Sequence, residues 1–227
     1  MSTLVVARRY RGPADSGNGG YTCGLVAALV DGDAEVTLRA PPPLERPLRV
    51  ERGDGQVRVL DLDTLVAEAR AVPLEFAPTE PVPHAVAAER SAALDDDPNH
   101  PFPSCFVCGP GREPGDGLRL RPAPIGDGRV AAPWTPTREQ AGRPELVWAA
   151  LDCPGAFAID PYLERGVSVL GRLHARVLET PRRGEECVVV GWPLADGEGR
   201  KQFAGTALFG EGGRLLGLGR ATWILLR

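Results

Sequence analysis

The chain has 227 residues, enough for one large domain or two small ones, each able to bury a core. Its net charge of −4 argues against nucleic acid as a partner, because phosphate binding needs a basic surface. No window approaches the roughly 18 apolar residues of a membrane span, so we expect no such span. Five cysteines without a recognisable secretion signal predict reduced thiols and a cytoplasmic location.

The first seventy-odd residues predict a strand, a glycine-rich loop, a short helix and four more strands. The helix covers residues 21–30, which are small and apolar, and Asp31-Gly32-Asp33 ends it. Alternating polarity and the turn at Gly53-Asp54-Gly55 indicate the strands that follow. The predicted strands are residues 4–10, 34–40, 48–52, 56–60 and 64–72.

Residues 73–104 interrupt this pattern. The segment holds seven prolines and an acidic run at residues 95–97, and only residues 84–94 favour a helix. We interpret residues 77–104 as a proline-rich linker with a short helix.

The second half repeats the order of the first. Residues 144–159 predict a buried helix, since Leu146, Ala149, Ala150, Cys153 and Phe157 recur at helical spacing. A repeated unit of this size indicates two equivalent structural units that share one continuous antiparallel sheet. The predicted strands are residues 118–121, 129–134, 167–179, 185–193, 202–209 and 215–226.

Asp152 lies inside this apolar helix. A buried carboxylate is unfavourable unless it is paired, faces a cleft or takes part in chemistry. Two interpretations stay open from the residues alone: Asp152 is a functional acid, or it ends the helix or caps a turn before Pro154-Gly155.

Four short motifs resemble those of hot-dog fold thioesterases. Asn18-Gly19-Gly20 resembles the His/Asn-Gly-Gly entry to the central helix of that fold. Cys105-Phe-Val-Cys108-Gly109, followed by Gly117-Leu118, is similar to the opening of small members of the family. The other two motifs are the proline-rich run at residues 38–50, which resembles the strand after the central helix, and residues 149–152, which are similar to the "aLLD" helix motif.

The resemblance covers most of the chain outside residues 77–100 and implies an α+β tandem (double) hot-dog, with an antiparallel sheet wrapped around two central helices. It implies a first repeat at residues 1–76 and a second at residues 105–227. Relatives with this architecture are acyl-CoA thioesterases, so an acyl-CoA or related thioester is the implied substrate. The implied catalytic residue is Asp152, activating water, with Thr206 and Thr222 as strand candidates, because the last strand has no glutamine and Gln202 opens the strand before it.

The glycine-rich entry to the first helix is the predicted substrate-binding element. Glycine allows close approach and a helix N-terminus is positive, so Asn18, Gly19, Gly20 and Tyr21 suit a developing oxyanion. The alternative is a turn with an N-cap. His174 either contributes to the cleft or is a structural histidine within a strand.

Cys105 and Cys108 form a single Cys-x-x-Cys pair. Zinc would need two further ligands, for which His100 is near in sequence and Cys153 is a spatial candidate. We expect small buried apolar residues here instead, and therefore no metal and no cofactor.

Two functions from different classes remain. The first is an acyl-CoA thioesterase-like hydrolase with Asp152 as base or nucleophile. The second is a non-catalytic acyl-CoA or small-lipid binding protein, which the missing glutamine favours. A hydratase is disfavoured because its Asp/His motif is absent, and a homodimer formed through sheet edges is left open.

Overall fold

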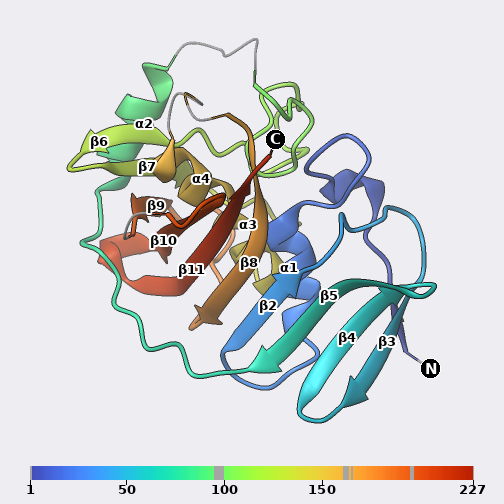
Figure 1. Ribbon diagram of the computed structural model, residues 1–227. Coiled ribbons are helices and arrows are strands. Elements are labelled where there is room, and N and C mark those ends of the chain that lie inside the picture. The colour runs from blue at the N-terminus through green and yellow to red at the C-terminus, as the bar shows by residue number, and fades with distance from the viewer. Residues whose placement is uncertain (1, 95–99, 161–163, 165, 195–196, 227) are drawn as a thin grey trace.

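The computed structural model describes residues 2–94, 100–160, 164, 166–194 and 197–226. Its strands form one 11-stranded sheet in the order β1-β3-β4-β5-β2-β8-β11-β10-β9-β7-β6, and every neighbouring pair is antiparallel. The sheet curves around the helices α1 and α3 (Figure 1). The expected single antiparallel sheet with central helices is therefore present.

The elements have the following bounds. The strands are β1 (Thr3–Leu4), β2 (Ala34–Leu38), β3 (Leu48–Gly53), β4 (Gln56–Asp61), β5 (Thr64–Ala71), β6 (Ala123–Gly126), β7 (Arg129–Trp134), β8 (Ser168–Val177), β9 (Cys187–Pro193), β10 (Lys201–Phe209) and β11 (Leu215–Leu225). The helices are α1 (Gly19–Ala27), α2 (His84–Ala92), α3 (Pro144–Ala150) and α4 (Cys153–Ile159), with 3-10 turns η1 (Arg8–Tyr10) and η2 (Glu211–Gly213). None of the helices in the described part of the chain is long and apolar enough to cross a membrane.

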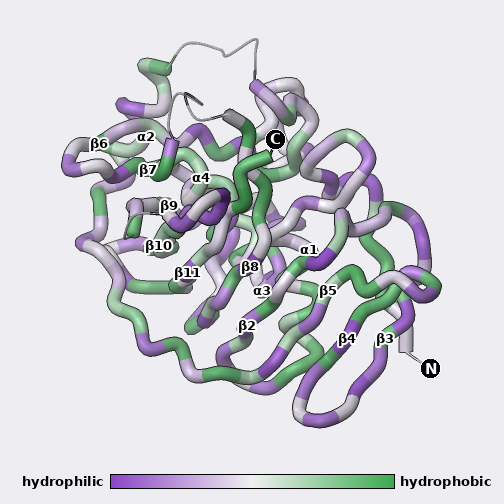
Figure 2. Tube along the Cα trace, in the orientation of Figure 1, coloured by the Kyte–Doolittle hydropathy of each residue, from purple (hydrophilic) through white to green (hydrophobic). Residues whose placement is uncertain are grey.

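The strands of the first half follow the alternation of the sequence. Along β4, hydrophobic and hydrophilic residues alternate (Figure 2), so Val57 and Val59 are buried while Gln56 and Arg58 are exposed. The predicted β3–β4 hairpin is confirmed. The predicted strand at residues 4–10 is wrong for most of its length, because β1 ends at Leu4 and the chain then turns through η1.

The predicted strand at residues 118–121 is also wrong. These residues do not form a strand, and β6 begins only at Ala123. The backbone N–H groups of Leu118 and Leu120 donate instead to the carbonyls of Phe106 and Val107, and Arg119 has a positive φ of 50°. These residues therefore support the loop that carries Cys105 and Cys108 rather than the sheet.

The predicted helix at residues 144–159 is two helices, α3 and α4. Pro154 lacks an N–H and its ring clashes with the carbonyl four residues earlier, so a continuous helix is unfavourable there. The break falls at Asp152, whose φ and ψ of −83° and −89° are not helical. The helix α3 therefore stops two residues before Asp152, with Leu151 as its C-cap, and Asp152 takes the N-cap position of α4 without a capping hydrogen bond from its side chain.

The proline-rich segment does more than connect the halves. Phe76 stacks on Trp192 with ring centroids 5.7 Å apart, and Ala87 of α2 is fully buried against β7 and β9. Val188 and Val190 face this layer, while Val189 faces the main core under α1, α3 and α4. The segment therefore covers the outer face of the sheet around β7 and β9, and its acidic run at residues 95–97 lies outside the described residues.

Candidate functional site

Asp152 connects the second half of the chain to the start of α1. Its Oδ2 accepts a hydrogen bond from the backbone N–H of Gly20 at 2.9 Å and another from Nδ2 of Asn18 at 2.8 Å. The side chain is buried, with the residue only 2% exposed. Because Gly20 lies in the first turn of α1, the carboxylate also interacts favourably with the positive end of the helix dipole.

The second carboxylate oxygen of Asp152 is different. Within the described chain, Oδ1 is buried and has no hydrogen-bond partner. The pKa of Asp152 is raised to about 7, chiefly by burial and also by a negative charge on Cys105, while the hydrogen bonds from Gly20 and Asn18 oppose the shift. A carboxyl group with such a pKa can accept or release a proton near neutral pH.

Asn18 has two tasks at this site. Its Oδ1 accepts from the backbone N–H of Tyr21 at 2.8 Å, which is the N-cap interaction expected for this residue type. Its Nδ2 is left to donate to Asp152. The N-cap alternative for Asn18 is therefore correct, and the same side chain also orients the acid.

Glycine permits the close contact between α1 and α3. A Cβ atom on Gly20 would lie 2.5 Å from Cβ of Asp152 and 2.6 Å from the carbonyl oxygen of Trp148. One turn later, a Cβ on Gly24 would lie 2.7 Å from Cα of Glu145. Only glycine lets the two backbones approach closely enough for the Gly20 N–H to reach Asp152.

A cavity of about 270 Å³ opens beside these groups. Asn18, Gly19 and Asp152 are among the residues that line it. Much of the remaining wall is apolar, and an apolar wall with a few polar groups is the usual composition of a small-molecule site. The apolar wall residues include Leu38, Pro41, Pro42, Phe102, Leu170 and Trp223, and Cys105 and Cys153 also line the cavity.

The other residues expected at the site lie elsewhere. The Thr206 hydroxyl donates to the Leu151 carbonyl at 2.8 Å, and Thr222 is not among the residues that line the cavity. His174 Nε2 lies 2.9 Å from the Val72 carbonyl oxygen, also away from the cavity. The Tyr21 ring stacks on Tyr10 at 3.9 Å, and burial raises the pKa of its hydroxyl.

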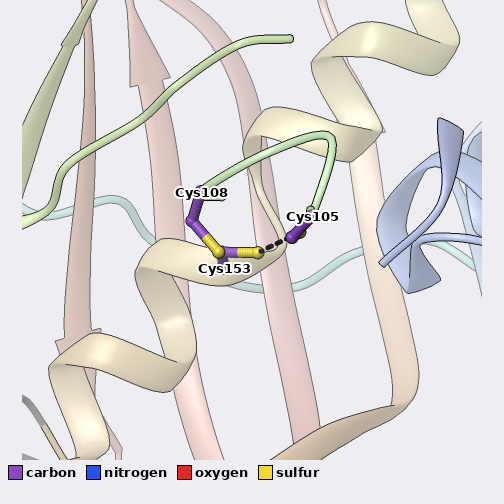
Figure 3. A group of neighbouring side chains, drawn as sticks. All are labelled: Cys105, Cys108 and Cys153. Carbon is purple, nitrogen blue, oxygen red and sulfur yellow. Dashed lines mark hydrogen bonds between the residues drawn. The ribbon is translucent and has the colours of Figure 1, made fainter. Parts of the chain in front are cut away.

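Three cysteines gather next to the acid. Sγ of Cys105 lies 3.8 Å from Sγ of Cys153 and 3.8 Å from Nδ2 of Asn18. Cys108 completes the group, and Figure 3 shows Cys105 and Cys108 on one loop facing Cys153 on α4. Hydrogen bonds from the Cys108 and Cys153 thiols hold the pKa of Cys105 well below its usual range. All five cysteines of the chain are free and buried.

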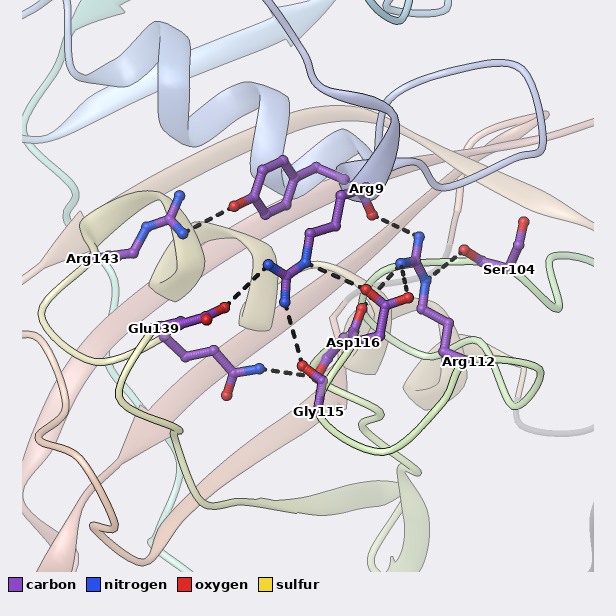
Figure 4. A network of polar contacts seen from close by, with 10 residues as sticks. Arg9, Ser104, Arg112, Gly115, Asp116, Glu139 and Arg143 are labelled. Carbon is purple, nitrogen blue, oxygen red and sulfur yellow. Dashed lines mark hydrogen bonds and ion pairs between the residues drawn. The ribbon is translucent and has the colours of Figure 1, made fainter.

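A buried arginine fixes the loop that carries two of these cysteines. Arg112 donates to the carbonyls of Ser104 at 2.9 Å, Arg9 at 2.6 Å and Asp116 at 3.0 Å (Figure 4). It also pairs with the Asp116 carboxylate at 3.0 Å, which in turn lies 3.4 Å from Nε of Arg9. The network fastens residues 104–116 to the N-terminal segment, so the position of the loop is defined by both halves of the chain.

No protein-family model matches the chain, and no curated protein matches it by sequence. Comparison by structure gives many matches. The chain is similar to the tesB protein MAP1729c of Mycobacterium avium subs paratuberculosis, with a TM-score of 0.58 and 15% identity over 95% of this chain and 90% of that one. A proposed thioesterase II from Thermobifida fusca YX gives a TM-score of 0.58 and 15% identity over 99% and 92% of the two chains.

A third structure carries the name of the fold. It is a protein of unknown function with a hot-dog fold from Alicyclobacillus acidocaldarius, with a TM-score of 0.57 and 11% identity over 100% of this chain and 92% of that one. This chain has a hot-dog fold. The neighbours of this hot-dog chain include thioesterase-superfamily proteins that match almost its whole length.

The sequence predicts the hydrogen-bonding residues of the hot-dog cavity but not most of its apolar walls. Asn18, Gly19 and Asp152 were expected and are brought together. Phe102 and Leu170 were not, because they contribute apolar surface from a loop and a strand that no local pattern connects. The Cys-x-x-Cys motif was the available signal for Cys105, and its neighbour in space proved to be Cys153.

Proposed function

We propose that the chain is a thioester hydrolase in which Asp152 activates water. The observation that supports this most directly is the free Oδ1 of Asp152, a buried carboxylate oxygen without a partner in the described chain, on a residue that lines an otherwise largely apolar cavity. The other oxygen, Oδ2, is held by Asn18 and Gly20, so the side chain has a fixed orientation. A base of fixed orientation beside a cavity is the arrangement that general base catalysis requires.

The reaction follows from these positions. Oδ1 takes a proton from water, and the water oxygen bonds to the thioester carbonyl carbon. The negative charge that develops on the carbonyl oxygen is stabilised by the N–H of Gly19, since the first residue of a helix has an amide that the helix itself does not use. The carbon–sulfur bond then breaks, and the departing thiolate takes the proton from Asp152, which restores the carboxylate and yields an acid and a thiol.

The proposal includes a tandem hot-dog organisation. Outward from the β2–β8 pair, one side of the sheet runs β5, β4, β3, β1 and the other runs β11, β10, β9, β7, with β6 as one further strand at that edge. These orders match: in each half they are the first, fourth, third and second strands after the helix of that half, and then the strand that precedes the helix. We assign the first repeat to residues 1–76, the linker to residues 77–104 and the second repeat to residues 105–227, with the site between the helices of the two repeats.

Acyl-CoA is the proposed thioester. The apolar wall suits an acyl chain, and Arg39, which also lines the cavity, offers a positive charge to the phosphates of the carrier. Five free thiols suit a reducing compartment such as the cytoplasm. A homodimer through the outer strands β1 or β6 would leave the cavity between the central helices unaffected.

Asp152→Asn tests the assignment. Asparagine keeps an acceptor for Gly20 and nearly the same shape but cannot accept a proton from water. With a panel of acyl-CoA esters, followed by the ultraviolet absorbance of the thioester bond, we expect kcat to fall by at least ~100-fold, the typical contribution of a general base. Turnover that survives the substitution would exclude Asp152 as the base.

A second candidate is a non-catalytic acyl-CoA or small-lipid binding protein. The observation that favours it is the position of the strand threonines: the Thr206 hydroxyl is committed to the Leu151 carbonyl, and Thr222 does not line the cavity. The same acyl-CoA panel separates the candidates. Saturable binding measured by calorimetry, with no turnover by the native chain, would favour the binding protein over the hydrolase.

A further inference from the structure

We propose that Cys105, Cys108 and Cys153 bind a zinc ion at the wall of the cavity. Their three sulfur atoms all lie within 4.8 Å of one another. Figure 3 shows the first two on the loop and the third at the start of α4, with the side chains directed toward one another. This inference stands on the thiol cluster and does not depend on the proposed hydrolase activity.

The spacing of the sulfurs fits a zinc tetrahedron. Zinc–thiolate bonds are about 2.3 Å long, so two sulfurs at the corners of a tetrahedron lie about 3.8 Å apart. The sulfurs of Cys105 and Cys153 are 3.8 Å apart although 48 residues separate them in the chain. The ion therefore requires little movement of the two elements.

The backbone around the cluster holds the ligands in place. The Gly109 N–H donates to the Cys105 carbonyl at 2.9 Å, and the Phe106 N–H donates to the Arg11 carbonyl at 2.7 Å. A Cβ on Gly109 would lie 2.5 Å from the backbone nitrogen of Cys105, so the turn after Cys108 is as tight as glycine allows. Together with the Arg112 network (Figure 4), these contacts fix the conformation of the loop before any metal binds.

Simple burial of apolar thiols does not explain this cluster. Cys187 is also fully buried, yet it is not part of the group of metal-ligating atoms. Three thiols from two separate elements meet at one point, and thiolate ligands favour soft or borderline ions such as Zn²⁺ over Mg²⁺ or Ca²⁺. Binding displaces the thiol protons, since cysteine coordinates as the thiolate.

The fourth ligand comes from the cavity side. Cys105 and Cys153 both line the cavity, which gives water access to the ion. Three cysteines and a water complete a tetrahedron, and three thiolates leave the zinc group with one net negative charge. Such an ion would join the 105–108 loop to α4 and fix the wall next to Asp152.

Metal binding by the reduced chain tests the proposal. The protein is reduced, stripped with a chelator and titrated with zinc chloride, and bound zinc is counted by native mass spectrometry. We expect one zinc per chain, a rise in melting temperature with added zinc, and thiolate-to-metal absorption when cobalt replaces zinc. No zinc retained by the reduced native chain, or a Cys105–Cys153 disulfide as the only product of the cluster, would overturn the proposal.

Two variants locate the ion. Cys153→Ser removes one ligand with little change of shape, and we expect at least a 100-fold weaker zinc affinity. Cys187→Ala, a change at a buried thiol outside the cluster, should keep the native affinity and stoichiometry, and circular dichroism confirms that each variant is folded. Unchanged affinity in Cys153→Ser, or equal loss in both variants, would place the zinc elsewhere.

Discussion

Nδ2 of Asn18 lies 2.8 Å from Oδ2 of Asp152, although 134 residues separate the two in the chain. The bond crosses from the N-cap of α1 to the break between α3 and α4. It joins a donor from one half of the chain to the proposed base from the other.

The raised pKa of Asp152 predicts how stability depends on pH. Its pKa is 3.8 in the unfolded chain and about 7 in the folded one, so between these values the folded state binds more protons. The free energy of unfolding should therefore fall as pH rises from about 4 to 7, by on the order of 4 kcal/mol from this group. Denaturant unfolding of the metal-free protein, with a chelator present, measures it. Asp152→Asn should abolish this part of the slope, and an unchanged slope would contradict the assignment.

Asn18→Ala should affect both stability and the pH profile of turnover. It removes the N-cap bond to Tyr21, which costs about 1 kcal/mol of unfolding free energy. It also removes a hydrogen bond that lowers the pKa of Asp152. A base acts only when deprotonated, so kcat/KM should rise with pH around 7 in the native chain and at higher pH in the variant. If the pH dependence of kcat/KM is the same in the variant as in the native chain, Asn18 does not influence the pKa of the base.

Gly20→Ala tests the contact between the helices. The new Cβ would lie 2.5 Å from Cβ of Asp152 and 2.6 Å from the Trp148 carbonyl oxygen, so a backbone must shift. We expect a loss of about 1–3 kcal/mol in unfolding free energy, as for other overpacked sites. Gly53→Ala is the matched control, since a Cβ there meets no atom within 4 Å. If chemical denaturation gives the same loss of unfolding free energy for both substitutions, the close contact between α1 and α3 is contradicted.

Arg39→Ala tests the proposed carrier. Arg39 lines the cavity and pairs with Glu68 at the surface, where its side chain is half exposed. If its charge contacts CoA phosphates, KM for an acyl-CoA should rise several-fold, whereas KM for the same acyl group on N-acetylcysteamine should not change. Glu68→Ala controls for loss of the ion pair. A parallel rise for both thioesters would exclude a role in phosphate recognition.

The sequence was most informative where one physical rule governed the outcome. Alternation identified β4, and residue type identified the cap at Asn18. It was least informative where a segment that could join the sheet forms its backbone hydrogen bonds with another, distant segment. Leu118 to Leu120 resemble a strand but bond to the 106–107 loop, a partner that only the folded chain provides.

Two features of the candidate site were beyond a local pattern. The break at Asp152 was marked by Pro154, yet apolar spacing on both sides of it favoured one long helix. The gathering of Cys105, Cys108 and Cys153 depends on how α4 docks on the sheet, which no spacing along the chain encodes.

The pairing of β2 with β8 has a consequence for how heating inactivates the protein. Four residue pairs, from Ala34 opposite Ala175 to Thr37 opposite Arg172, join the two parts of the sheet, and α1 and α3 close the same junction from inside. The acid and its amide donors belong to opposite sides of that junction. Opening of this junction would separate Asp152 from its donors, so on heating the loss of activity should come no later than the loss of β-sheet circular dichroism.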